Sequence, residues 1–286
     1  MFVTDDLLSV PPAAGVPSIT QGVSGDRGNL ELAYADPQDG LWVCWFNNDL
    51  TPVGDVGPGE WSSGLHFAPG SRYLAVDIVQ ASSGPDFIEV VAVTADAVER
   101  WTWSPAAGFE HSGSLAVPGA RGVALAESDD GFVVCAPSSD GTVWVWRADA
   151  VGYPRLDWSP PSRHPLPADA TRWTVRPTAG GLRAAVATPD GVLLTDDVEG
   201  EPWRPVLLGP ADVSALCWVS PHTAGAEPAL VVVAGGELAT VSTEAEPSVV
   251  ATGVVADDMA AATSLVDRQR LEVVTRSGTA VVHRRW

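Results

Sequence analysis

Lysine is absent from the 286-residue sequence: all 16 basic residues are arginines, against 36 acidic residues, and the formal net charge is −20. A surface this acidic repels the phosphates of nucleic acids and of anionic lipids. We therefore expect neither a nucleic acid nor a membrane as a partner. Arginine together with abundant alanine, valine and glycine also suggests a GC-rich bacterial source.

Cysteine is scarce as well. Cys44, Cys135 and Cys217 each lie in an apolar run, and their odd number and wide spacing indicate buried thiols of a reducing compartment rather than disulfides. No run of 18 apolar residues is present, and Asp5 and Asp6 stand where a signal peptide would be positively charged. The sequence therefore predicts a cytoplasmic protein, which we expect to be a monomer.

The short motifs of common catalytic sites are also missing. The sequence has no G-x-S-x-G elbow, no phosphate-binding glycine loop, no His-x-x-x-His pair and no Cys-x-x-Cys pair. The five histidines are widely separated: His66, His111, His164, His222 and His283. The sequence therefore predicts no metal site and no cofactor.

The sequence does contain a repeated hairpin. In SSDGTVWVWRADA, residues 138–150, apolar alternation follows the turn pair Asp140-Gly141. Comparable pairs recur at intervals of 57, 44, 50, 45 and 42 residues: Asp39-Gly40, Asp96-Ala97, Asp140-Gly141, Asp190-Gly191, Gly235-Gly236 and Ser277-Gly278. The Asp-Gly and Gly-Gly pairs favour type I′ turns, which need positive φ at both central residues. A period of roughly 40–50 residues built from strands is typical of a β-propeller.

A second sequence feature, a proline, repeats with a similar period at a different position within each unit. Prolines that precede a segment of small and apolar residues follow one another at 58, 49, 49 and 43 residues: Pro11, Pro69, Pro118, Pro167 and Pro210. The two markers together divide the chain into units of four strands.

The two ends of the chain complement each other. The last unit stops at Trp286 after its third strand, whereas FVTDDLLSV, residues 2–10, supplies a strand that has no unit of its own. Pairing between them would close a ring and remove an exposed sheet edge. The sequence therefore predicts an all-β fold in which residues 1–286 form a single six-bladed β-propeller domain closed by the N-terminal outer strand. A pair of β-sandwiches, the alternative, would not need this complementarity.

Residues 123–150, VALAESDDGFVVCAPSSDGTVWVWRADA, resemble a WD40-type repeat. The resemblance extends to about half of each unit and is strong only in this one. The Gly-His and Trp-Asp dipeptides of that family are absent, since Arg147 follows Trp146. The resemblance implies a propeller, and its implication of protein scaffolding is weak.

In a propeller, the segments that lead into the first strand of each unit surround one mouth of the central channel. Alignment of these segments gives one charged residue in each of five units: Arg72, Arg121, Arg172, Asp212 and Asp258. Three arginines facing two carboxylates suit an anionic or dipolar ligand, because guanidinium groups bind carboxylate or phosphate with paired hydrogen bonds.

Three neighbouring residues extend this candidate ligand-binding site. Tyr73 and Trp173 adjoin two of the arginines and would add stacking or cation–π contacts. Asp77, five residues after Arg72, is a candidate catalytic base if burial raises its pKa.

Two interpretations of these residues stay open. The arginines either bind a ligand or form salt bridges between units, with Asp169, Asp212 and Asp258 as partners. The tryptophan pairs either pack in the core or line a sugar site: Trp42/Trp45, Trp101/Trp103 and Trp144/Trp146.

Two functions are compatible with this pattern. The first is a binding propeller that recognises a small anionic or dipolar metabolite, or a protein partner, at the mouth of the channel. The alternative is a metal-free enzyme of bacterial metabolism, secondary metabolism included: a lyase, cyclase or isomerase. A deep pocket that holds an aspartate opposite an arginine would favour catalysis, and a channel filled by apolar residues would favour a scaffold.

Overall fold

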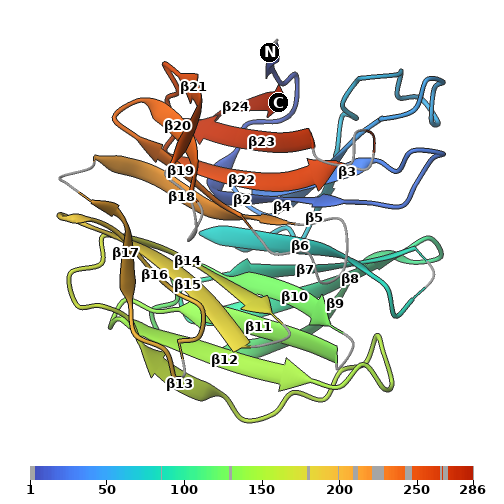
Figure 1. The fold of residues 1–286 in the computed structure, drawn as a ribbon. Coiled ribbons are helices and arrows are strands. Elements are labelled where there is room, and N and C mark those ends of the chain that lie inside the picture. Colours follow the sequence, from blue (N-terminus) through green and yellow to red (C-terminus); the bar gives the residue numbers. More distant parts are fainter. Residues whose placement is uncertain are drawn as a thin grey trace.

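A computed structural model gives the fold of the chain. It describes residues 4–84, 86–128, 131–178, 181–198, 200–208, 212–220, 229–241, 247–264, 266 and 270–285. The secondary structure of these residues consists of strands, with no helix, so the expected all-β class is confirmed for the described part. The colours of Figure 1 follow one another round the molecule, from blue through green to red.

Antiparallel pairing joins the strands into six sets of four. Set 1 comprises β2 (Ala14–Gln21), β3 (Leu30–Ala35), β4 (Leu41–Phe46) and β5 (Leu65–Phe67). Set 2 comprises β6 (Ala75–Ala81), β7 (Phe87–Val93), β8 (Ala97–Ser104) and β9 (Gly108–Ala116). Set 3 comprises β10 (Ala124–Ser128), β11 (Gly131–Pro137), β12 (Thr142–Ala148) and β13 (Ser162–Pro165).

The second half of the chain repeats this order. Set 4 comprises β14 (Arg172–Thr178), β15 (Gly181–Thr188), β16 (Gly191–Thr195) and β17 (Arg204–Leu208). Set 5 comprises β18 (Val213–Ser220), β19 (Leu230–Ala234), β20 (Glu237–Val241) and β21 (Ser248–Thr252). Set 6 comprises β22 (Asp258–Ser264), β23 (Arg270–Ser277), β24 (Ala280–Arg285) and β1 (Thr4–Leu7).

The N-terminal strand pairs with the C-terminal one. β1 runs antiparallel to β24, with Thr4 opposite Arg285 and Leu7 opposite Val282. Because β1 is the fourth strand of set 6, the first residues of the chain complete the last set. The predicted pairing of the two ends is confirmed for the described residues.

First strands of successive sets lie against each other. β2 contacts β6, β6 contacts β10, and the series continues through β14 and β18 to β22, which contacts β2 again. Two short parallel pairings, Val16 with Ala75 and Val219 with Ala261, merge sets 1 and 2 and sets 5 and 6 into eight-stranded sheets. The described strands therefore make four sheets.

The hydrophobic core is divided among the interfaces between neighbouring sets. Each of six clusters of buried side chains combines residues of two adjacent sets. Within β7, Val90 packs in the cluster towards set 1, whereas the next residue, Val91, packs in the cluster towards set 3. Successive side chains of a strand point to opposite faces, so a strand covered on both faces is apolar at every position. This explains continuous apolar runs such as residues 90–93 of β7 and the whole of β19.

All six predicted turn pairs lie at the junction of the second and third strands of a set, although Ala97, Gly191 and Ser277 are themselves terminal strand residues. The expected type I′ turn is confirmed at Gly235-Gly236, where both residues have positive φ, 57° and 81°. It is wrong at the Asp-Gly pairs: at Asp140-Gly141 only the glycine has positive φ, 79°. There the Gly141 amide donates to the Ser138 carbonyl (3.1 Å) and the Ser138 amide to the Thr142 carbonyl (2.8 Å). This is a three-residue loop that ends in a bulge, which needs one left-handed residue rather than two.

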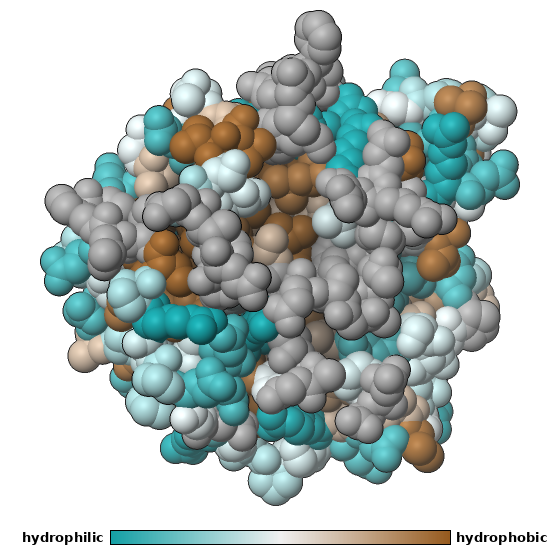
Figure 2. All heavy atoms as spheres, in the orientation of Figure 1, coloured by the Kyte–Doolittle hydropathy of each residue, from teal (hydrophilic) through white to brown (hydrophobic). Residues whose placement is uncertain are grey.

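The exterior is mixed in polarity. On the face of Figure 2, hydrophobic residues are visible towards the middle of the view and hydrophilic residues predominate along its lower rim. The exposed large hydrophobic residues are dispersed over several sets and include Leu50, Leu74, Val151 and Val255.

The closure of set 6 can be tested by cross-linking. In Leu7→Cys/Val282→Cys, the two cysteines replace directly opposed residues, and we expect a disulfide that raises the free energy of unfolding by about 2–4 kcal/mol, because it restricts the unfolded chain. Urea denaturation with and without reductant measures the difference. The offset pair Asp6→Cys/Val282→Cys is the control, since Asp6 lies opposite His283 and adjacent residues project to opposite faces. Equal cross-linking of both pairs would contradict the register.

Candidate functional site

A cavity of about 340 Å³ is lined by first strands of all six sets and by residues that lead into them. Its charged lining residues are Asp77, Arg121, Arg172, Arg176 and Asp258. The cavity lining thus carries three arginines against two aspartates, in a protein whose net charge is −20. A recessed site with this surplus of positive charge attracts anions.

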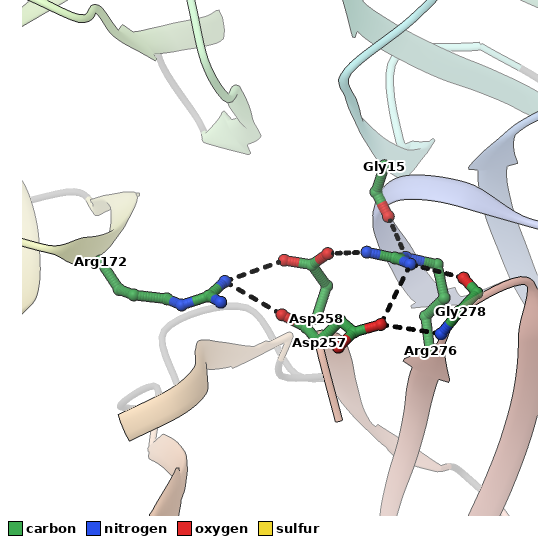
Figure 3. A network of polar contacts seen from close by, with 6 residues as sticks. All are labelled: Gly15, Arg172, Asp257, Asp258, Arg276 and Gly278. Atoms are coloured by element: carbon green, nitrogen blue, oxygen red, sulfur yellow. Dashed lines mark hydrogen bonds and ion pairs between the residues drawn. The ribbon is translucent and has the colours of Figure 1, made fainter. Parts of the chain in front are cut away.

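At the mouth, an arginine from set 4 reaches a pair of aspartates in set 6 (Figure 3). The Arg172 guanidinium lies 3.4 Å from the Asp258 carboxylate and donates a hydrogen bond to the Asp257 carbonyl (3.0 Å). The Arg172 side chain is 41% exposed, so water and salt screen this ion pair. Arg172 is therefore held in place and still accessible to a ligand.

Arg276, at the end of β23, holds the other side of Asp258 (Figure 3). It forms an ion pair with the Asp258 carboxylate and another with Asp257 at 3.5 Å. It also donates hydrogen bonds to the carbonyls of Gly15 (2.8 Å) and Gly278 (2.6 Å). Burial raises the pKa of Asp258, and the Arg276 hydrogen bond and charge, followed by the charge of Arg172, oppose that rise. Arg276 thus joins set 6 to set 1 at this mouth.

Gly15 adopts a conformation that a side chain would prevent. Its φ is +66°, and a Cβ atom there would lie 2.5 Å from the Leu74 carbonyl oxygen. The absence of a side chain lets β2 approach set 2 closely, next to the Arg276 contact.

Arg121 differs from Arg172 in having no competing carboxylate. Its backbone amide donates to the Pro137 carbonyl (2.9 Å), but its exposed side chain has no hydrogen-bond or ion-pair partner among the described residues. The ring of Trp173 lies over Gly122, where a Cβ atom would come within 2.6 Å of the ring. An unpaired guanidinium and an indole therefore line the same part of the cavity.

Asp77 lies deeper, where three first strands meet. Its carboxylate accepts hydrogen bonds from the Ser18 hydroxyl of β2, the Leu125 amide of β10 (2.6 Å) and the Ile78 amide (2.9 Å). The residue is half-buried, because it faces the cavity, but protein atoms displace most of the bulk water around it. Burial therefore raises the pKa of Asp77, although these hydrogen bonds and the nearby Arg176 charge oppose the rise.

Arg176, on β14, brings a positive charge into the same interior. Loss of water lowers the pKa of its guanidinium, and the Asp77 and Cys217 side chains oppose that shift. Burial raises the pKa of the Cys217 thiol to about 12, so the thiol is protonated at neutral pH. The deep part of the cavity thus combines a carboxyl group, a guanidinium and a neutral thiol.

The structure brings five of the sequence-predicted residues together and places three elsewhere. Arg121, Arg172, Trp173, Asp77 and Asp258 line the cavity.

The other three do not line it. Arg72 is exposed and donates to the Gln38 carbonyl (3.3 Å), and the Tyr73 hydroxyl is buried and donates to Glu99 (2.5 Å). Asp212 is exposed, and its carbonyl accepts from the Gly235 amide (3.1 Å). The alignment placed these residues one per unit, but their loops direct the side chains outward or between sets.

Two arginines were missed by the sequence reasoning. Arg176 interrupts an otherwise apolar segment, WTVRPT, and a charge inside a buried strand was the available signal. Arg276 directly precedes the Ser277-Gly278 turn, and such turns lie at the same end of the sets as the segments that enter the first strands. The two interpretations of the arginines therefore apply to different residues. Arg172 forms a salt bridge with an acidic partner, whereas Arg121 has no such partner among the described residues and is free to bind a ligand.

The tryptophan pairs also divide between the two interpretations. The rings of Trp144 and Trp146 are stacked with their centroids 6.0 Å apart, and the Arg163 guanidinium lies 3.7 Å from the centroid of the Trp144 ring. This pair therefore takes part in packing. Trp45 and Trp103 line a second cavity.

The described residues contain neither a metal-type cluster of side chains nor a membrane-spanning helix. No three His, Cys, Asp or Glu side chains there are grouped as metal ligands would be. No helix of the described chain has the length and apolarity to cross a bilayer. Phe2, Val3, Pro210, His222 and Trp286 lie outside the described residues.

Comparison with known proteins identifies the fold. No family model matches the chain, and no curated protein matches it either. Solved structures do resemble it. The fucose-specific lectin from Aleuria aurantia superposes with a TM-score of 0.61 at 12% identity, covering 96% of this chain and 94% of that chain. BBS1N, solved in complex with ARL6DN, gives 0.59 at 14% identity, covering 98% and 94%.

A third neighbour is an enzyme. The exo-β-1,3-galactanase from Phanerochaete chrysosporium gives a TM-score of 0.54 at 11% identity, covering 96% of this chain and 69% of that chain. These neighbours are β-propeller-like, and the chain has a β-propeller-like, all-β fold. At such low identities, the similarity concerns the fold alone.

The pKa of Asp77 gives a prediction for Asp77→Asn. Because the folded state raises this pKa above its ordinary value of 3.8, the wild-type carboxyl stabilises the fold most when protonated. This contribution to the free energy of unfolding is complete at pH values below the pKa that Asp77 has in the unfolded chain. It is lost as the pH rises through the higher pKa that Asp77 has in the folded protein. We expect the stability advantage of wild type over Asp77→Asn, measured by urea denaturation, to shrink as the pH is raised above 4.

Asp140→Asn is the control with the opposite sign. Hydrogen bonds from Ser138 and Thr142 lower the pKa of Asp140, so the wild-type advantage should be lost as pH falls. A wild-type advantage over Asp77→Asn that grows with pH would show that this carboxyl is stabilised as the anion.

Proposed function

We propose that residues 1–286 form a single six-bladed β-propeller domain, with sets 1 to 6 as its blades and the 340 Å³ cavity as its central channel. The cyclic contacts of the first strands support this architecture, as does the presence of one hydrophobic cluster between each two neighbouring sets. β1 would then be the outer strand that closes the ring.

We propose further that this channel binds a small molecule with a carboxylate or phosphate group, or a zwitterion. The observation that carries the proposal is the unpaired Arg121 guanidinium beside Arg172 and Trp173 in one cavity. In a chain with 36 acidic residues, an arginine without a carboxylate partner retains hydrogen-bonding capacity that an anionic group can use. The carboxyl group of Asp77 and the hydroxyl of Ser18 would meet the polar end of a dipolar ligand.

The dimensions favour a metabolite over a protein partner. A volume of about 340 Å³ lies at the lower end of the range for small-molecule pockets. A protein partner would have to use the rim rather than the interior, where the arginines and Asp77 are gathered. The lectin among the structural neighbours is described as fucose-specific and BBS1N was solved with a partner, so propeller-like folds serve both purposes.

Substitution of the mouth arginines tests the binding proposal. Charge-assisted hydrogen bonds contribute about 1.5–3 kcal/mol each, so Arg121→Ala should weaken binding roughly tenfold to hundredfold. Arg172→Ala should weaken it less, because in wild type a ligand must compete with Asp258. Thermal-shift screening with succinate, glutamate and glucose 6-phosphate would select a ligand, and calorimetry would measure its affinity.

Arg72→Ala is the matched control, since it removes an arginine outside the cavity and should leave affinity unchanged. An equal loss in Arg72→Ala and Arg121→Ala would contradict a site in the channel. So would the absence of any shift with all three classes of anion.

Proton-transfer catalysis is a second candidate function, favoured by the presence of both Asp77 and Arg176 in the lining of the cavity, where their charges interact. A carboxyl group with a raised pKa is a better proton acceptor than an ordinary aspartate, and a guanidinium in the same interior would stabilise negative charge developing on a substrate. This arrangement corresponds to the deep pocket, with an aspartate near an arginine, that would favour an enzyme.

Isotope exchange tests this second candidate without knowledge of the complete reaction. If Asp77 removes a proton from carbon, a ligand found by the screen should exchange a C–H proton for deuterium in D2O, followed by proton NMR. Asp77→Asn should bind the ligand but lose the exchange. Exchange that persists in Asp77→Asn, or that is absent in wild type with a bound ligand, would contradict catalysis by Asp77. The binding function would then be the one that remains.

A further inference from the structure

A second cavity, of about 280 Å³, lies between sets 1 and 2. Its lining includes Ser24, from the β2–β3 connection, Val53 to Asp55, from the β4–β5 connection, and Asp86, which precedes β7. These connections lie at the ends of the sets opposite to the second-to-third-strand turns, which are at the Arg172 mouth. The second cavity therefore opens away from the candidate channel site.

One wall of this cavity is aromatic. Trp45 on β4 and Trp103 on β8 come from the third strands of neighbouring sets, and Phe109 on β9 lies beside them. Both tryptophans are only partly buried, so their rings face the open volume as well as the core. Val43 and Ile88, which are buried, close the inner side.

The polar part of the lining is acidic. It contains Glu31, Asp55 and Asp86, and no arginine is among its residues. Glu31 is 6% exposed, and one of its oxygens accepts a hydrogen bond from the Asn29 amide group. Its other oxygen, Oε2, accepts no hydrogen bond from any described residue. Oε2 retains some exposure, since it is not one of the fully buried polar atoms without a partner, and it can therefore contact a cationic group in the cavity.

We propose that this cavity binds an organic cation: an ammonium group attached to a small apolar body. The apolar body would occupy the space between Trp45, Trp103 and Phe109, and the ammonium group would lie against the indole faces and the Glu31 carboxylate. Aromatic faces attract cations through the ring quadrupole, most strongly where water is excluded. Three acidic groups without a basic residue in the lining exclude anions by the same electrostatics.

The protonation of Glu31 supports this assignment. Burial raises the pKa of Glu31 to about 8; the Asn29 hydrogen bond opposes that rise, and the Asp86 charge adds to it. Burial also raises the pKa of Asp86. At pH 7 the empty site therefore holds a proton on Glu31, which a bound cation replaces. Binding should release up to one proton at pH 7, and the affinity should increase as pH rises through 8.

A neutral sugar is the competing ligand class, since it would also pack on tryptophan. Its binding would not displace the Glu31 proton, and it would leave the Asp86 carboxylate without a counter-charge. The charge of the lining therefore favours the cation.

The experiment uses benzyltrimethylammonium, whose charge does not change with pH, with benzyl alcohol and D-glucose as neutral probes. Isothermal titration of the full chain should give at least tenfold tighter binding of the cation than of either neutral probe. Titration at pH 7 in two buffers of different ionisation enthalpy should show proton release, which disappears at pH 9.5. Equal or tighter binding of benzyl alcohol or glucose, or no binding of the cation, would overturn the proposal.

Two variants locate the site. Glu31→Gln should weaken cation binding at least tenfold and abolish proton release, whereas Glu237→Gln, an equal charge change at an exposed position of set 5, should do neither. Trp103→Leu provides a second measurement if Glu31→Gln fails to fold, and it should weaken the cation more than benzyl alcohol. Unchanged cation binding in a folded Glu31→Gln or Trp103→Leu variant would overturn the assignment.

Discussion

The pairing of β1 with β24 is the interaction on which the rest of the molecule depends. It gives set 6 its fourth strand and commits the first residues of the chain to the last set. β22 then contacts both β18 and β2, so each first strand has neighbours on both sides. A strand covered on both faces buries side chains on both of them, and the contacts between sets therefore supply most of the apolar core. The cavity among the first strands is a consequence of the same arrangement.

Arg121 and Arg172 occupy equivalent positions in the repeat, but they differ in whether an acidic partner lies within reach. Arg172 reaches Asp257 and Asp258, which Arg276 holds from the other side. Arg121 enters the same cavity without an acidic partner among the described residues. A structural ion pair satisfies its own charges, whereas an unpaired guanidinium retains hydrogen-bonding capacity. The second arrangement is the one expected of a binding site.

The two cavities have opposite electrostatic character although they belong to one very acidic chain. The central cavity has an excess of arginine, and the cavity between sets 1 and 2 has only acidic charges. Their apolar parts also differ, since aromatic rings dominate the second. An anion and an organic cation would therefore partition between them by charge alone, and each site can be tested without disturbing the other.

The sequence by itself determined the strand order, the positions of the six turns and the pairing of the chain ends, because these follow from the spacing of turn residues and from the period of apolar runs. It also placed Arg121, Arg172 and Asp77 in one cavity through their common position in the repeat. Only the tertiary structure decided that Arg72 and Tyr73 point elsewhere, and that Arg176 and Arg276 take part. The physical reason is that the partner of a side chain is set by atoms on strands of other sets. Those strands are far away along the chain, so no local sequence pattern reveals them.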